Sequence, residues 1–280
     1  MPPGPWRPPA CGRDGLLRRR GPAVVRLVHA EGEPVVVAAA AGSGGVRLHA
    51  KARSRTGALA GIERMRFALG VDHDLAAFHD RFRRHPLLGP LIRRKPWLRP
   101  RRHPEPFEAL AWAVCEQLIE SGRAADIERQ IVRHYGRRSD CGRFRDGPTA
   151  EAIAVRAPAE LEACGLSAGR ALALVKCARE VAAGRADLSE HEPAWRRLRS
   201  ISGIGAWTME KLAFEGQGRD DQLPAGDLAY IKLVGVLAGL GRRASEDEVR
   251  EFFEPYAPYS GIAGWYLLHA AQVRSAARFS

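Results

Sequence analysis

Long apolar runs are missing from this sequence of 280 residues, and none approaches the length that crosses a membrane. The first residues, MPPGPWRPPACGRDGLLRRRGP, contain charges but no apolar segment followed by a cleavage site. The sequence therefore predicts neither a secretory signal nor a membrane partner. We expect a cytoplasmic protein.

Cysteine is also scarce, and its five copies show neither the CxxC spacing nor the Cys/His spacing of a metal site. This pattern is typical of a reduced intracellular chain, so we expect buried thiols and no disulfides. The five are Cys11, Cys115, Cys141, Cys164 and Cys177.

Positive charge is in excess, because 44 Lys and Arg residues stand against 32 Asp and Glu residues and give a formal net charge of +12. Hydrophobic residues make up 45% of the chain, which is enough for a substantial core. The excess charge indicates a polyanionic partner such as nucleic acid, although a basic surface is also compatible with a merely soluble protein.

The N-terminal part alternates short β-branched runs with turn residues. Runs at 24–28, 35–40 and 45–49, separated by EGEP and AGSGG, predict a small antiparallel sheet, and a helical pattern starts near Gly57. Nine Arg or Lys residues and no acid lie between Arg81 and Arg102. We interpret this Pro-rich stretch as a solvated linker, with a rim that contacts phosphates as the alternative.

Apolar residues recur at helical spacing throughout the remainder of the chain, starting with a helix from Phe107 that includes Leu118 and Ile119. The fold class is therefore mixed α+β, with a small N-terminal α/β layer followed by a large helical domain. We expect a basic mobile arm at 1–22, an α/β domain with its linker at 23–102 and a helical domain at 103–280. Further helices are predicted at 124–135, 149–155, 158–164, 167–183, 193–200, 206–215, 227–239, 245–254 and 260–275.

The stretch Leu198–Gly205, LRSISGIG, lies between two of these helices. Gly203 and Gly205 allow positive φ and close backbone approach, and the next helix offers its free N–H groups to an anion such as phosphate. Ile204 would anchor the hairpin on the helices. An ordinary turn between helices is the alternative that the glycines alone leave open.

Several motifs together resemble the helix-hairpin-helix DNA glycosylases, in particular the DNA-3-methyladenine glycosylase II branch. They are Leu198–Gly205, Trp207-Thr208, Leu223-Pro224, Asp227-Leu228 and Lys232. The resemblance extends roughly from Val24 to Val273. It implies a monomeric, monofunctional hydrolase of base excision repair, which would release a damaged, alkylated base flipped out of double-stranded DNA and leave an abasic site.

Of the nearby aspartates, the resemblance assigns catalysis to Asp227, whereas Asp220 and Asp221 lie in the preceding loop. Asp227 also precedes the helical stretch 228–239, so it is predicted to cap that helix. Capping donors favour an ionised carboxylate, which could stabilise an oxocarbenium-like sugar or orient a water.

Trp207 stands where lyase relatives carry a lysine that forms a Schiff base. An indole cannot form an imine, but its face can stack on an electron-poor base. By the same resemblance Gln117 contacts the base, Leu118 is a wedge inserted into the duplex, and the hairpin residues Gly203, Ile204, Gly205 and Thr208 contact DNA. Core packing is the alternative for Trp207 and Leu118.

The chain departs from the family pattern at Glu116 and Glu120, in place of Gly and Ser, and at Lys211, in place of a common Tyr. Two acids four residues apart would repel each other on one helix face. They could tune the pocket toward cationic bases, or they could be exposed and relieved by Arg123.

No cofactor is implied. Some members of the family that this chain resembles carry an iron–sulfur cluster held by four C-terminal cysteines, but no cysteine here lies beyond Cys177. The backbone carbonyls of Arg199, Ile201 and Ile204 could hold a monovalent cation. Two other functions remain open: a catalytically idle DNA-binding or damage-sensing module, and a glycosylase for oxidised or deaminated bases.

Overall fold

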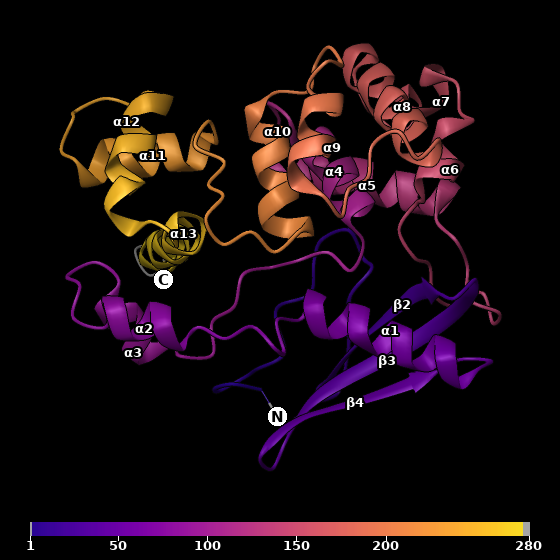
Figure 1. The fold of residues 1–280 in the computed structure, drawn as a ribbon, viewed down its shortest axis with the longest axis horizontal. Coiled ribbons are helices and arrows are strands. Elements are labelled where there is room, and N and C mark those ends of the chain that lie inside the picture. Colours follow the sequence, from indigo (N-terminus) through magenta and orange to yellow (C-terminus); the bar gives the residue numbers. More distant parts are fainter. Residues whose placement is uncertain (1, 277–280) are drawn as a thin grey trace.

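A computed structural model describes residues 2–276, with side chains described as far as residue 271. Its N-terminal layer is a four-stranded antiparallel meander in the order β1-β2-β3-β4, formed by β1 (Arg18–Arg20), β2 (Ala23–Ala30), β3 (Glu33–Gly42) and β4 (Gly45–Lys51). Helix α1 (Arg55–Ala68) packs on this sheet (Figure 1). The three predicted strands are confirmed. Strand β1, a run of three exposed arginines, carries no apolar pattern that could have predicted it.

Helix α1 lies very close to the sheet because a glycine faces β3. A Cβ added at Gly61 would lie 2.7 Å from Cγ1 of Val35, so any side chain there would push the helix away. Ser54 caps the start of the helix by accepting the Gly57 N–H at 2.9 Å. Met65 and Leu69 then join the buried cluster of the sheet.

The N-terminal arm lies against the body of the protein, so the prediction of a mobile arm at 1–22 is wrong. The indole N–H of Trp6 donates to the carbonyl of Leu69 at 2.9 Å, and its ring is buried with the sheet residues. Farther along, Leu16 enters the helical core and buried Asp14 pairs with Arg101 at 2.7 Å. These contacts are distant in sequence, which is why local composition did not reveal them.

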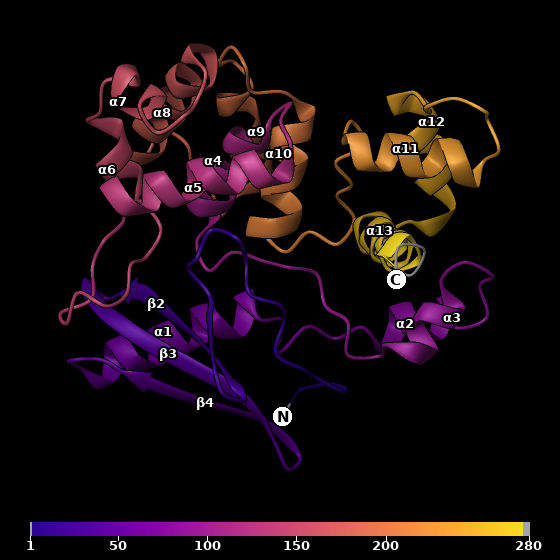
Figure 2. The same cartoon turned by 180° about the vertical axis from the view of Figure 1, so that it is seen from behind.

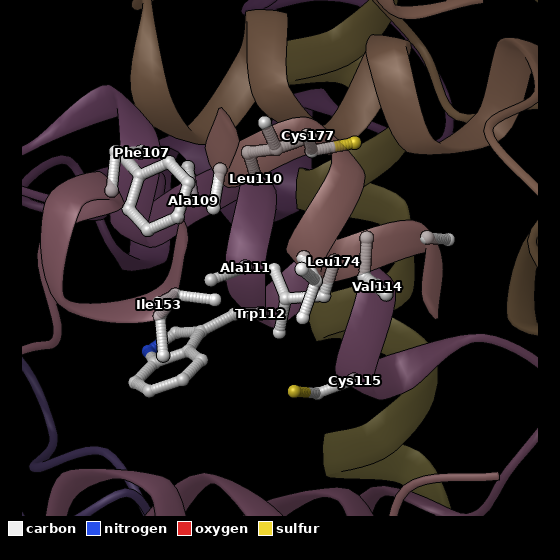
Figure 3. Packing of buried hydrophobic residues seen from close by; sticks show 14 of the residues in the cluster. Phe107, Ala109, Leu110, Ala111, Trp112, Val114, Cys115, Ile153, Leu174 and Cys177 are labelled. Atoms are coloured by element: carbon white, nitrogen blue, oxygen red, sulfur yellow. The ribbon is translucent and has the colours of Figure 1, made fainter. Parts of the chain in front are cut away.

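The first helical lobe surrounds α4, whose residues from Phe107 to Cys115 are all buried (Figure 3). Trp112, which is 1% exposed, lies at its centre. The lobe consists of α4 (Pro106–Glu116), α5 (Ser121–Tyr135), α6 (Ala150–Ala154), α7 (Pro158–Glu162), α8 (Ala168–Ala182), α9 (His191–Leu198), α10 (Ala206–Lys211) and the π-helical turn η1 (Leu212–Gly216).

The second helical lobe combines the C-terminal helices with two helices that precede α4 in the sequence (Figures 1 and 2). Its C-terminal elements are α11 (Leu228–Leu237), α12 (Glu246–Phe253), the 3-10 turn η2 (Glu254–Tyr256) and α13 (Ser260–Ala276), and they pack against α2 (Ala76–Phe82) and α3 (Gly89–Arg94). The rings of Phe78 and Tyr266, for example, are 5.1 Å apart.

This lobe corrects the expected division at residue 102. Leu88, Leu91 and Ile92 are buried in the C-terminal core, so this part of the basic stretch is not a solvated linker. The predicted helices of the C-terminal part are confirmed, apart from small shifts at their ends and the π-helical turn after Lys211.

Two further expectations concern the surface and the thiols. Cys115, Cys164 and Cys177 are buried as predicted, but Cys11 and Cys141 are exposed. Among the described residues, no helix is both long and apolar enough to cross a membrane.

Candidate active site

The two helical lobes meet at Trp207 of α10 and Asp227 at the start of α11. The indole N–H of Trp207 donates to Oδ2 of Asp227 at 3.3 Å, and both side chains are half-buried. The other carboxylate oxygen, Oδ1, accepts the Ala229 N–H at 2.8 Å, so the predicted helix cap is confirmed. The cap fixes the carboxylate and leaves one oxygen directed at the indole.

The two aspartates before this site have other partners. Asp220 pairs with Arg102 at 2.6 Å and with His73 at 2.8 Å, which ties the loop to the segment before α4. Asp221 pairs with Arg219 at 2.9 Å. Asp227 differs from both because neutral donors, an amide and an indole, hold its carboxylate.

The hairpin connects α9 to α10 and presents its glycines to solvent. Gly203 has a φ of +89°, which favours glycine, but Gly205 has a φ of −105°, so the expectation of positive φ applies only to Gly203. Ile204 is 5% exposed and packs in the helical core, as expected for the anchor. Thr208 is 1% exposed and its hydroxyl accepts a hydrogen bond from Gln117, so its contact with DNA stays a prediction.

The segment between α4 and α5, residues 117–120, is not helical, and we call it the wedge loop. Helix α4 ends at Glu116, so the prediction of a helix through Leu118 and Ile119 is wrong. Leu118 has a φ of +55° and is 105% exposed, which rules out core packing. The amide of Gln117 is engaged within the protein, because its Nε2 donates to the carbonyl of Gly203 at 2.9 Å and to Oγ1 of Thr208 at 2.8 Å, and its contact with a base stays a prediction.

Glu116 and Glu120 do not share a helix face, because Glu116 is the last residue of α4, whereas exposed Glu120 stands just before α5 and its side chain makes no capping hydrogen bond. The expected repulsion between them is therefore wrong. Glu116 forms an ion pair with Lys211, which is 9% exposed and also lies 3.4 Å from Glu215. Burial alone would lower the pKa of Lys211, but the carboxylates of Glu116 and Glu215 raise it above its ordinary value.

The acidic partners of Lys211 continue into a buried charge chain that sequence reasoning missed. His103 contacts Glu215 at 3.5 Å through Nε2 and Glu108 at 2.7 Å through Nδ1, and Glu108 pairs with Arg26 of β2. Although burial favours the neutral acids, Arg26 and His103 lower the pKa of Glu108 to about 2. Lys211 and His103 likewise lower the pKa of half-buried Glu215 to about 2. No local pattern marks such a chain, because its members come from separate elements.

Among the described residues, no group of three or more His, Cys, Asp or Glu side chains could hold an ion. In the hairpin, the carbonyl of Ile201 already accepts the Ile204 N–H at 3.0 Å and retains a second lone pair.

Comparisons with known proteins agree on one family. Residues 111–258 match the model of the HhH-GPD superfamily of base excision DNA repair proteins. A DNA-3-methyladenine glycosylase of Bacillus subtilis is 26% identical over 204 residues, which cover 70% of this chain and 67% of that protein.

Two solved structures are also similar. The 3-methyladenine DNA glycosylase of Archaeoglobus fulgidus has a TM-score of 0.80 at 24% identity, covering 92% of this chain and 89% of that one. The Schizosaccharomyces pombe 3-methyladenine DNA glycosylase, solved with abasic DNA, has a TM-score of 0.56 at 30% identity, covering 65% of this chain and 90% of that one.

Proposed function

Because the chain belongs to the HhH-GPD superfamily of base excision DNA repair proteins, we propose that it is a DNA-3-methyladenine glycosylase. It acts in base excision repair on alkylated bases of double-stranded DNA and hydrolyses the N-glycosidic bond of a flipped nucleotide. The product is a free base and an abasic site.

The observation that carries this proposal is the pairing of Trp207 with Asp227, which joins the two helical lobes at 3.3 Å. A flipped nucleotide seated here has its base near an indole face and its sugar near a carboxylate. The indole stacks on an electron-poor alkylated base. The carboxylate stabilises positive charge that develops on the sugar as the bond to the base breaks, or orients the attacking water.

Release without strand cleavage is supported by the state of the Lys211 amine, which lies 5.4 Å from the ring centroid of Trp207. A lyase needs a neutral lysine as nucleophile. Trp207 supplies no amine, and Lys211 is buried between Glu116 and Glu215, which keep it protonated. We therefore assign a monofunctional hydrolase.

The DNA contacts follow from the exposed parts around the site. Gly203 and Gly205 of the hairpin are exposed and bring backbone close to a phosphate, while Leu118 projects fully into solvent as a wedge. The net charge of +12 strengthens the attraction to the duplex. A monovalent cation on the carbonyls of Arg199, Ile201 and Ile204, a monomeric state and a cytoplasmic location stay predictions.

The test is base release from a duplex containing 7-methylguanine, with Asp227→Asn as the variant. Asn still caps α11, so folding and DNA binding should persist, while release should fall roughly 10²–10³-fold. Asp221→Asn is the matched control, because that aspartate lies in the same loop region but pairs with Arg219. Unchanged release by folded Asp227→Asn would refute the assignment. Wild-type protein that binds damaged duplex but releases no base would instead be a damage sensor.

A further inference from the structure

We propose that Gln117 and the Glu116–Lys211 ion pair are positioning elements that hold the wedge loop in a preformed conformation on α10. In this view they determine how well the enzyme opens a stable base pair. The inference rests on the proposed function, which supplies the flipped substrate.

The wedge loop needs such support because its tip is strained. A left-handed backbone at Leu118, with φ of +55°, brings the Cβ of an L-residue too close to the following carbonyl oxygen. Full exposure of the side chain means that packing does not compensate for this strain. The conformation must therefore be stabilised by the residues on either side of Leu118.

Three side chains provide that stabilisation: Gln117 of the loop itself, Lys211 of α10 and Arg170 of α8. The Gln117 amide donates to the Gly203 carbonyl at 2.9 Å and to the Thr208 hydroxyl at 2.8 Å. The ammonium of Lys211 binds Glu116 at the end of α4. Arg170 of α8 donates to the Cys115 carbonyl at 2.8 Å and satisfies the last turn of that helix.

The same contacts fix the wedge relative to the base-stacking residue. Thr208 and Lys211 are three residues apart on α10 and therefore lie on the same side of the helix. The Lys211 ammonium also lies 5.4 Å from the ring centroid of Trp207. Wedge loop, hairpin and Trp207 are thus connected through one helix.

Preorganisation has a specific consequence for flipping. A wedge that is already ordered loses less conformational freedom when it enters the base stack. Opening a pair costs most when the lesion is well paired and least when it is already unpaired. Loss of the Gln117 hydrogen bonds or of the Glu116–Lys211 ion pair should therefore slow excision from a well-paired site and leave excision from an unpaired site almost unchanged.

The experiment compares single-turnover release of 7-methylguanine opposite cytosine and opposite an abasic position. Gln117→Ala and Glu116→Gln are the test variants, and Glu116→Gln leaves Lys211 paired with Glu215 so that the fold is preserved. Leu118→Ala is the benchmark for a lost wedge. Glu162→Gln, the same kind of change at an exposed position of α7 outside the wedge loop, is the control.

We expect the single-turnover rate of both test variants to fall about tenfold on the paired substrate, which is the effect of one polar contact. On the unpaired substrate the rate should fall less than about threefold. Leu118→Ala should show the same pattern, and Glu162→Gln should change neither rate. Equal losses on both substrates, or no loss on either, would overturn the proposal.

A second readout separates this proposal from the proposed function. In the Asp227→Asn background, 2-aminopurine placed beside the lesion should become more fluorescent when the protein unstacks the site. Adding Gln117→Ala should reduce that signal at saturating protein. If wild type releases no base, the proposed function fails, and the fluorescence comparison alone decides whether Gln117 positions the wedge.

Discussion

Glu128 gives a sharp test of the buried electrostatics, through the substitution Glu128→Gln. Its side chain, on α5, is 5% exposed. Burial, followed by repulsion from Glu116 and Asp14, raises the pKa of Glu128 to about 8, in spite of the positive charge of Arg101. Gln has the same shape and does not titrate.

The sign and size of the effect follow from linkage. The stabilising contribution of a group with a raised pKa is fully present below its unfolded-state value, 4.5 here, and is lost as pH rises through about 8. Over that range the unfolded wild type releases a proton that the folded protein keeps, which costs up to about 1.4 kcal/mol per pH unit. Between pH 4.5 and pH 8, the free energy of unfolding of Glu128→Gln should rise relative to that of wild type by roughly 3–5 kcal/mol.

The assay is urea denaturation of both proteins at pH 5 and pH 8. His103 and other titrating groups are common to both, so their contributions cancel in the difference. Glu162→Gln, the same chemical change at an exposed position of α7, is the control and should show no such trend. A difference between wild type and Glu128→Gln that is equal at the two pH values, or that favours wild type at pH 8, would refute the reasoning.

Three further predictions follow from the site and the arm. Borohydride added during the reaction should trap no covalent protein–DNA adduct, because Lys211 is held protonated; an adduct that disappears in Lys211→Gln would contradict this. Binding to undamaged duplex should fall steeply between low and physiological salt, since phosphate contacts dominate; a binding constant that salt leaves unchanged would contradict it. Trp6→Ala should lower the free energy of unfolding by about 3 kcal/mol in urea titrations, whereas a mobile arm would give no change.

Sequence predicted the features that depend on local pattern. Short β-branched runs separated by turn residues predicted the strands, and the spacing of apolar residues predicted most helices. Gly226-Asp227 before a helical stretch predicted the cap at α11. The end of α4 was missed because the apolar spacing continues to Ile119. The helix stops at Glu116 where Lys211, Thr208 and Arg170 hold the following loop, and those residues lie far away in sequence.

The roles of the charged residues were predicted least well. The sequence leaves Glu116 as either a pocket acid or an exposed one, yet it binds a lysine on α10. In the sequence Lys211 is only a departure from a family pattern, and nothing there indicates that it is buried. Burial of a charge is decided by partners from other elements, so neither composition nor periodicity reveals it.

The buried chain from Arg26 through Glu108, His103 and Glu215 to Lys211 limits how the gene can be rearranged. A helical fragment cut after the sheet would leave Glu108, which is 1% exposed, without the guanidinium of Arg26 that helps keep it ionised. Recombination with another N-terminal layer would have to bring an arginine to the same place. In this chain the sheet and the helices therefore form one electrostatic unit, which a cut between them would break.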